Sequence, residues 1–170
     1  TGAMLWVGDA GKAVSSAEEY LQKSNHPWLV RALALGLALE GQSERAMQVA
    51  KNRVRVESES LFLMAMIAAI AGNKEQASNL ASDYFALNGP NDHDGLLFAA
   101  LRGERNEANR LAAIIDARPF GHIVLLQAVY DCMCGAPFDL VSTPRFSTML
   151  RGSGLSWPPL QPYEFQLKNW

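Results

Sequence analysis

The chain has 170 residues, of which 49% are apolar and 19% charged, which suits one compact domain or a short array of stacked repeats. Its formal net charge of −2 argues against a nucleic-acid partner, because such binders need a strongly basic face. Cys132 and Cys134 are too few for a disulfide framework or a zinc site, and they leave the compartment open between cytoplasm and periplasm. The longest uncharged apolar run, residues 61–71, is shorter than the roughly 20 residues of a membrane span, so we expect no direct membrane insertion.

Three segments are expected along the chain. Residues 1–4 resemble a remnant of cloning, so we expect a fragment of a larger protein. Residues 5–155 are expected to form a helical repeat domain, because alanine and leucine, both strong helix formers, dominate this part of the sequence. Residues 156–170 contain three prolines and four aromatic residues and are expected to form an extended tail that packs on another surface.

A repeat of 31 to 33 residues organises the helical part. A glycine is followed five residues later by a small or apolar residue at Gly8/Ala13, Gly41/Ala46, Gly72/Ala77, Gly103/Ala108 and Gly135/Leu140. Each glycine is expected to end one helix in the left-handed conformation that glycine adopts most easily. The small residue is expected where the next helix crosses the first, because a bulky side chain there would separate the two.

The apolar pattern then gives the helices in chain order. First helices are predicted over residues 28–40, 59–71, 92–102 and 122–134, and second helices over residues 9–23, 43–54, 74–87 and 104–117. Turn residues separate successive pairs at residues 25–27, 88–91 and 118–121. The link over residues 54–60 contains no such helix breaker, so its boundary is the least defined.

This pattern over residues 8–152 resembles the tetratricopeptide repeat family. With each glycine aligned to the turn inside a repeat, the packing positions of the first helix fall on Leu33, Ala34, Leu37, Met64, Ala65, Ala68, Gly95, Leu96, Ala99, Gln127, Ala128 and Asp131. Gly95, Gln127 and Asp131 depart from the family pattern, and its tryptophan, tyrosine and closing proline are mostly missing. The resemblance implies an all-α solenoid of helical hairpins, coiled as a right-handed superhelix with a concave binding face.

The segment after the repeats resembles the closing helix of such arrays in bacterial multidomain regulators, including nucleotide cyclases and winged-helix transcription factors. The matching residues are Pro144, Arg145, Phe146, Leu150, Gly154 and Leu155. Thr143 is expected to cap this helix, with Pro144 at its first position.

Motifs for nucleophilic catalysis, phosphate binding or calcium binding are not found, so we expect no enzyme, no cofactor and no metal. The segment from Asn91 to Asp94 places two carboxylates around one imidazole, but such residues are more often helix caps. His26 and His122 also stand at expected helix starts and are interpreted in the same way. A metal-dependent hydrolase around Asp92, His93 and Asp94 is retained as the less favoured alternative.

The expected concave face is the better functional candidate. Matching positions along the first helices predicts a groove lined by Trp28, Arg31, Leu35, Phe62, Met66, His93, Leu97, His122, Leu126 and Val129. Such an apolar row favours a protein-interaction module, a scaffold or sensor, that binds a peptide or helix. Two alternatives stay open: a shift of register would place several of these residues in the core, and the tail could fill the groove. Self-association through an apolar N-terminal edge, giving a homo-oligomer, is the other functional alternative.

Overall fold

The computed structural model describes residues 9–132, 136–154 and 157, and over these residues the chain is helical and contains no strand. The all-α prediction is therefore confirmed. The elements in chain order are α2 (Ala10–Leu21), α3 (Pro27–Leu39), α4 (Ser43–Arg53), α5 (Glu57–Ile70), α6 (Lys74–Asn88), α7 (Asp92–Leu101), α8 (Arg105–Asp116), α9 (Gly121–Cys132), the short 3₁₀ helix η1 (Leu140–Ser142) and α10 (Pro144–Ser153).

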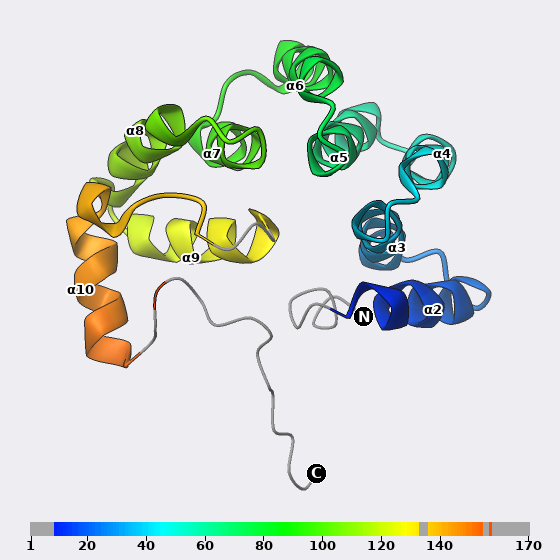
Figure 1. Cartoon of the computed structure of the whole chain (residues 1–170), viewed down its shortest axis with the longest axis horizontal. Helices are drawn as coiled ribbons and strands as arrows, with labels where there is room; N and C mark the ends of the chain where they lie inside the picture. The colour runs from blue at the N-terminus through cyan, green and yellow to red at the C-terminus, as the bar shows by residue number, and fades with distance from the viewer. Residues whose placement is uncertain (1–8, 133–135, 155–156, 158–170) are drawn as a thin grey trace, which may run out of the picture.

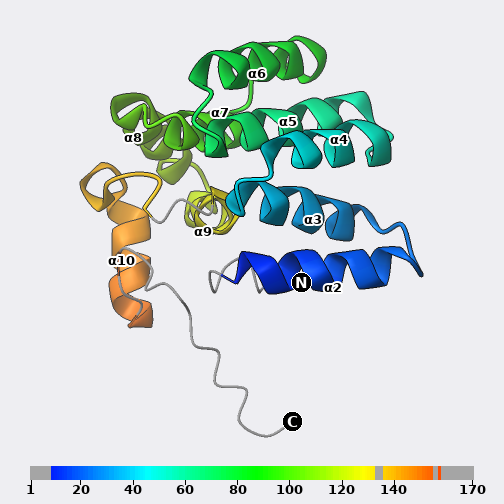
Figure 2. The same ribbon diagram turned by 45° about the vertical axis from the view of Figure 1, so that its right-hand side comes forward.

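The helices follow one another around an arc (Figure 1). Helix α3 packs on α4, α5 on α6 and α7 on α8. Helices α3, α5, α7 and α9 lie on the inner side of the arc, and α4, α6 and α8 lie outside them (Figure 1). Figure 2 shows α2, α3, α4 and α5 stacked as roughly parallel rods. Among the described residues, no helix is long and apolar enough to cross a membrane.

The repeated glycines make the turns that the sequence predicts. Gly41, Gly72 and Gly103 have φ angles of +77°, +77° and +74°, where a side chain would be strained. At each turn the residue after the glycine donates its backbone N–H to a carbonyl five residues earlier, as in Gln42 to Leu37 at 2.8 Å. These are three copies of one helix-ending motif. Gly8 and Gly135 lie outside the described residues.

The alanines after these glycines also lie where they are expected. Ala13, Ala46, Ala77 and Ala108 are at most 2% exposed, and each sits on a second helix packed against the preceding or following inner helix. Leu140 at the fifth match is half-buried. Small side chains at these crossings allow close approach of the helix backbones.

Two apolar clusters make up the core, one over α2 to α6 together with Phe98 of α7, and the other over α7 to α10. Phe62 and Leu101 pack against both clusters. Phe62 also contacts the rings of Tyr84 and Phe98, with centroids 5.4 and 5.3 Å away. The repeats therefore share one continuous interior rather than folding as separate hairpins.

The closing helix α10 begins where the sequence predicts, with Thr143 at the N-cap position and Pro144 as its first residue. The side chain of Thr143 makes no capping hydrogen bond, because its hydroxyl donates to the carbonyl of Leu140 at 3.4 Å. The carboxylate of Asp116, which is 3% exposed, instead accepts the backbone N–H groups of Arg145 at 2.9 Å and Phe146 at 2.8 Å. A buried carboxylate from α8 thus satisfies the first turn of α10 and attracts its positive dipole end.

Trp157 is the part of the expected tail that the structure describes. Its ring lies 5.2 Å from that of Phe138 and 5.7 Å from that of Phe146, measured between centroids. The tail thus begins by packing on the second core cluster. The other residues of the expected extended tail, 156 and 158–170, lie outside the described residues.

Candidate functional site

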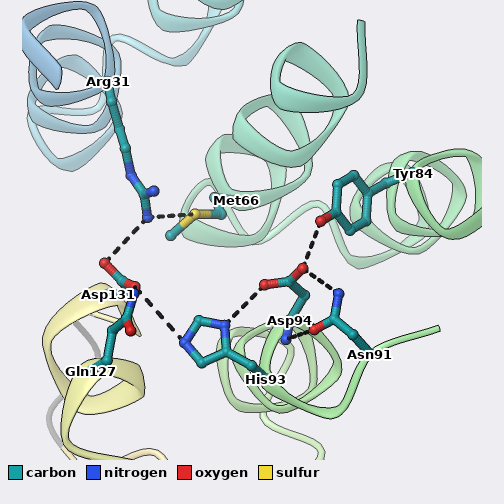
Figure 3. A network of polar contacts seen from close by, with 8 residues as sticks. All are labelled: Arg31, Met66, Tyr84, Asn91, His93, Asp94, Gln127 and Asp131. Carbon is teal, nitrogen blue, oxygen red and sulfur yellow. Dashed lines mark hydrogen bonds and ion pairs between the residues drawn. The ribbon is translucent and has the colours of Figure 1, made fainter. Parts of the chain in front are cut away.

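A network of polar side chains joins the inner helices α3, α5, α7 and α9 to α6 (Figure 3). Arg31, Phe62 and His93 occupy the same position in three successive repeats, 31 residues apart. All three are partly buried. Because a fixed repeat length gives equivalent residues equivalent orientations, one register position supplies a cation, a ring and an imidazole to the same inner surface.

Arg31 lies at the α3 end of this network. Its Nη2 is 3.4 Å from Oδ1 of Asp131 on α9, a contact across 100 residues of chain, and 3.9 Å from Sδ of Met66. The guanidinium carbon lies 5.8 Å from the centre of the Trp28 ring and 5.4 Å from that of Phe62, within the range of cation–π attraction. Two rings therefore orient this cation, while its ion pair is longer than the 2.7–2.9 Å of a strong charged hydrogen bond.

Asp94 on α7 is held much more firmly. Its Oδ2 accepts hydrogen bonds from the Tyr84 hydroxyl and from Nδ2 of Asn91, both at 2.6 Å, and its Oδ1 lies 3.0 Å from Nδ1 of His93. Asn91 caps α7 by accepting the backbone N–H of Asp94 at 2.8 Å. The prediction that this segment caps a helix is confirmed for Asn91.

The environment shifts two titrations in this cluster. Burial alone would raise the pKa of Asp94, but hydrogen bonds from His93, Tyr84 and Asn91 outweigh it and lower the pKa below its ordinary 3.8. Burial, together with the hydrogen bond to the Asp94 carboxylate, raises the pKa of the Tyr84 hydroxyl to about 12. Asp94 is thus stabilised as the anion and Tyr84 as the neutral donor.

His93 lies between two carboxylates. Its Nδ1 faces Asp94, while its Nε2 lies 3.9 Å from Oδ2 of Asp131, too far for a hydrogen bond. Within the described part of the chain, Nε2 is the one buried side-chain nitrogen or oxygen without a hydrogen-bond partner. The imidazole is therefore fixed on one side and unsatisfied on the other.

The structure brings half of the predicted groove together. Trp28, Arg31, Phe62, Met66 and His93 meet around the Arg31 guanidinium or the adjoining imidazole. His122, Leu126 and Val129 are half-buried on α9, and Leu126 and Val129 pack against the second core cluster.

Three predicted groove residues need correction. Leu35, Met66 and Leu97 are 2%, 0% and 0% exposed, so they present no surface to a partner. Leu35 and Met66 belong to the first core cluster, and Leu97 belongs to the second. The expected row of apolar side chains is therefore interrupted, and the inner surface is closed by the polar network.

Five residues of the network are not among the predicted groove residues: Tyr84, Asn91, Asp94, Gln127 and Asp131. The sequence did single out Asn91 and Asp94, but as helix caps or as part of the alternative metal site. Gln127 and Asp131 also carried a signal, since they are polar residues at positions where the family pattern expects small or apolar ones. Asp131 meets Arg31, and Gln127 lies 3.5 Å from the same carboxylate through Nε2.

The alternative of a metal site finds no supporting geometry. Asp92 pairs with Arg118, whereas Asp94 turns toward Tyr84 and His93, so the two carboxylates do not converge. Over the described ranges, no group of three or more histidine, cysteine, aspartate or glutamate side chains is arranged to hold a metal. His26, interpreted as a cap, accepts the backbone N–H of Trp28 through Nδ1 at 3.3 Å.

The N-terminal helix offers little apolar surface for self-association. Ala10, Ala13 and Ala17 of α2 are buried. Its exposed face carries Lys12, Ser15, Glu18, Glu19 and Tyr20, of which only Tyr20 is largely apolar. The apolar residues 5–7, on which an N-terminal edge would also depend, lie outside the described residues.

A depression of about 490 Å³ lies apart from the network, between α2 and α4. It is lined mainly by polar side chains over an apolar floor: Glu18, Leu21, Gln22, Leu33, Arg45, Gln48, Val49, Asn52 and Arg53. Glu18 and Arg45 form an ion pair of 2.5 Å within it. It does not coincide with the predicted groove.

Comparison of the chain with protein-family models, with curated proteins and with solved structures finds no match.

Proposed function

We propose that this chain is a non-catalytic protein-interaction module, a scaffold or sensor built as a tetratricopeptide-like solenoid. It binds a peptide or helix at the inner surface of its arc, beside Trp28 and Arg31. The paired helices, the repeated glycine turns and the inner layer of α3, α5, α7 and α9 support this proposal. The resemblance of the closing segment to bacterial regulators suggests a larger bacterial protein as its context.

The observation that carries the proposal is the exposed indole of Trp28. This residue is 67% exposed, although hydration of so large an apolar ring is unfavourable. Its ring lies against the guanidinium of Arg31, so both groups are ordered before any partner arrives. Tryptophan and arginine are the residues most enriched at the energetic centres of protein interfaces, and prior ordering reduces the entropy lost on binding.

The polar network limits the shape of the partner. Arg31 contacts Asp131 across the arc, so the inner surface is not an open apolar channel. A partner therefore docks at the edge of this surface, beside Trp28. An apolar or aromatic side chain would pack on the indole, and polar groups of the partner would meet the exposed parts of Arg31 and Asp131.

Selection from a random displayed peptide library, followed by calorimetric titration of the recovered peptides, tests the proposal. We expect Trp28→Ala to weaken binding at least tenfold, as loss of a central aromatic contact does. The melting temperature and helical circular dichroism should be unchanged, because the indole is mostly in solvent.

Leu39→Ala is the matched control, since Leu39 lies at the other end of the same helix and is 42% exposed. It should bind every recovered peptide like the wild type. Equal binding by wild type, Trp28→Ala and Leu39→Ala would place the binding surface elsewhere and end the proposal. Phe62→Ala is not a suitable probe, because Phe62 packs in the core against Tyr84 and Phe98.

A further inference from the structure

A groove runs along α4, on the side of α3 that faces away from the polar network. Its larger part is the depression of about 490 Å³ between α2 and α4, and a second depression of about 430 Å³ adjoins it, because Arg45 and Gln48 line both. Leu33 lines the first depression and follows Arg31 by two residues, which places the two side chains about 200° apart around α3. We call the two depressions together the α2–α4 groove.

The length of this groove suits an extended chain. Its lining continues from Gln42 at the start of α4 to Arg53 at its end. At a rise of about 1.5 Å per residue, a helix of 11 residues is about 16 Å long. An extended peptide rises about 3.3 Å per residue, so about five residues of such a peptide span the groove. This length favours a peptide over a compact small molecule.

Free amide side chains line both walls of the groove. Gln48 and Asn52 are four residues apart, so they lie one turn apart on the same face of α4, and Gln22 follows the end of α2. All three are exposed, and within the described residues their side chains make no hydrogen bond to another protein group. Each amide offers one acceptor and two donors, which matches the acceptors and donors of a peptide backbone.

Between these walls the groove has an apolar floor. Leu33 is 5% exposed, and the half-buried side chains of Leu21 and Val49 pack against the first core cluster. An apolar side chain of a partner would cover this floor, and removal of apolar surface from water favours binding.

The charge of the groove changes along its length. Glu18 and Arg45 form an ion pair of 2.5 Å between its two walls, so these two charges compensate each other. Arg53 at one end and Glu44 at the other are the remaining charged residues of its lining. In the part of the chain that the structure describes, neither forms an ion pair. The two ends of the groove therefore have opposite charge.

Three cations gather at the Arg53 end. Lys51 and Arg55 are exposed like Arg53, and over the described ranges none of the three forms an ion pair. Together they exceed the partial negative charge of about 0.5 at the end of a helix. Glu57 and Glu59 belong to the first turn of α5 but line neither depression. This end of the groove is thus positive on a chain whose net charge is −2, and it attracts a carboxylate.

We propose that the α2–α4 groove is a second binding surface, which takes an extended, acidic peptide segment of a partner protein. The backbone of the segment bonds to the amides of Gln48 and Asn52. An apolar side chain of the segment covers the floor beside Val49, and a carboxylate pairs with Arg53. The direction of the segment is fixed by charge, because a carboxylate placed beside Glu44 would be repelled.

This surface goes beyond the binding of a partner beside Trp28. Helix α4 lies outside α3 in the arc (Figure 1), so the α2–α4 groove and the inner surface are separated by α3. A chain with both surfaces holds two partners side by side, as a scaffold does. Because the two surfaces share no residue, the loss of one leaves the other intact, and the two proposals fail separately.

Selection from a displayed library of short random peptides tests the groove, with the Trp28→Ala protein as the target so that the inner surface does not contribute. The recovered peptides should be enriched in aspartate or glutamate close to an aliphatic or aromatic residue. In calorimetric titration, Arg53→Glu should weaken their binding at least about tenfold, because like charges then face each other. Arg151→Glu is the matched control, since it makes the same charge change at an exposed position of α10, and it should bind like the parent protein.

A second pair of variants tests the amides without a change of charge. Asn52→Ala should weaken binding several-fold, whereas Asn79→Ala, the same change at an exposed position of α6, should not. Both variants should keep the helical circular dichroism and the melting temperature, because alanine favours a helix. Equal binding by the two variants would contradict the contacts between the amides and the backbone of the segment.

Three other results would overturn the proposal as a whole. They are the recovery of no peptide, the recovery of peptides without acidic residues, and equal binding by Arg53→Glu and Arg151→Glu. A homo-oligomer that Arg53→Glu dissociates, as measured by light scattering, would also overturn it, because a second copy of the chain would then occupy the groove.

Discussion

The two carboxylates that flank His93 are held in opposite ways. Asp94 accepts short hydrogen bonds from Tyr84 and Asn91, whereas each contact of Asp131 is 3.4 Å or longer. Both are partly buried, with side chains 15% and 19% exposed, so exposure does not explain the contrast. The difference lies in the partners, because Asp94 is bonded within two adjacent elements and Asp131 meets residues from distant repeats.

The same network therefore contains one firmly held carboxylate, Asp94, and one weakly held carboxylate, Asp131. Local partners such as Asn91, three residues before Asp94, are positioned by the same helix start and hold the carboxylate at little cost. The partner of Asp131 on α3 is 100 residues away in sequence, and its position depends on the curvature accumulated over every repeat between them. The curvature of a repeat array changes easily, because each repeat contacts mainly its neighbours.

The largest expected effect comes from removing the Asp94 carboxylate, which accepts the short hydrogen bonds of the network. Asp94→Ala leaves the Tyr84 hydroxyl and the Asn91 amide without their acceptor, and hydrogen bonds to charged groups contribute about 1.5–3 kcal/mol each. We expect the free energy of unfolding to fall by about 2–3 kcal/mol, measured by urea denaturation at pH 7. Asp83→Ala on the exposed face of α6 is the control and should change stability by less than about 0.5 kcal/mol. Equal effects of the two variants would show that the short contacts of Asp94 carry no special stability.

The hydrogen bond between Tyr84 and Asp94 should also make the free energy of unfolding depend on pH at the acid and alkaline extremes. Because the pKa of Asp94 is lowered in the fold, its contribution is present above the ordinary value of 3.8 and is lost as the pH falls through the lower folded value. The pKa of Tyr84 is raised to about 12, so its contribution is complete below pH 10 and disappears as the pH rises toward 12.

Both ends of this profile can be measured separately. Absorbance titration of tyrosine ionisation should show one group with a midpoint near pH 12, which Tyr84→Phe removes. Urea denaturation below pH 4 should show a steeper loss of stability in the wild type than in Asp94→Asn. A wild-type protein whose tyrosines all ionise near pH 10 would refute the bond between Tyr84 and Asp94.

The sequence predicted the helices and their turns well, because their determinants are local. The predicted first helix over residues 28–40 is α3 (Pro27–Leu39), and the second over residues 43–54 is α4 (Ser43–Arg53). The glycine at each turn and the alanine five residues later act within one hairpin, so a single repeat contains the information. Even the link without a helix breaker separates α4 from α5 at Val54 to Val56, where the backbone is extended.

Features that depend on distant parts of the chain were not predicted. Thr143 occupies the predicted N-cap position of α10, but the side chain that accepts the first backbone N–H groups is that of Asp116, 29 residues before Arg145. The inward orientation of Arg31 and His93 followed from the repeat, but their meeting with Asp131 depends on how strongly the arc curves. Leu35 and Leu97 were placed on a surface because the repeat length alone does not show how tightly neighbouring hairpins pack.

The smallest expected effect comes from Asp131. At pH 7, Asp131→Ala should lower the free energy of unfolding by no more than about 1 kcal/mol, since long and partly exposed ion pairs contribute about 0–1 kcal/mol. Urea denaturation of the wild type, Asp131→Ala and Asp94→Ala under the same conditions measures the difference between the two carboxylates. A loss in Asp131→Ala as large as that in Asp94→Ala would show that the long contacts across the arc stabilise the fold as much as the short contacts within α6 and α7, and the contrast between the two carboxylates would then have no energetic meaning.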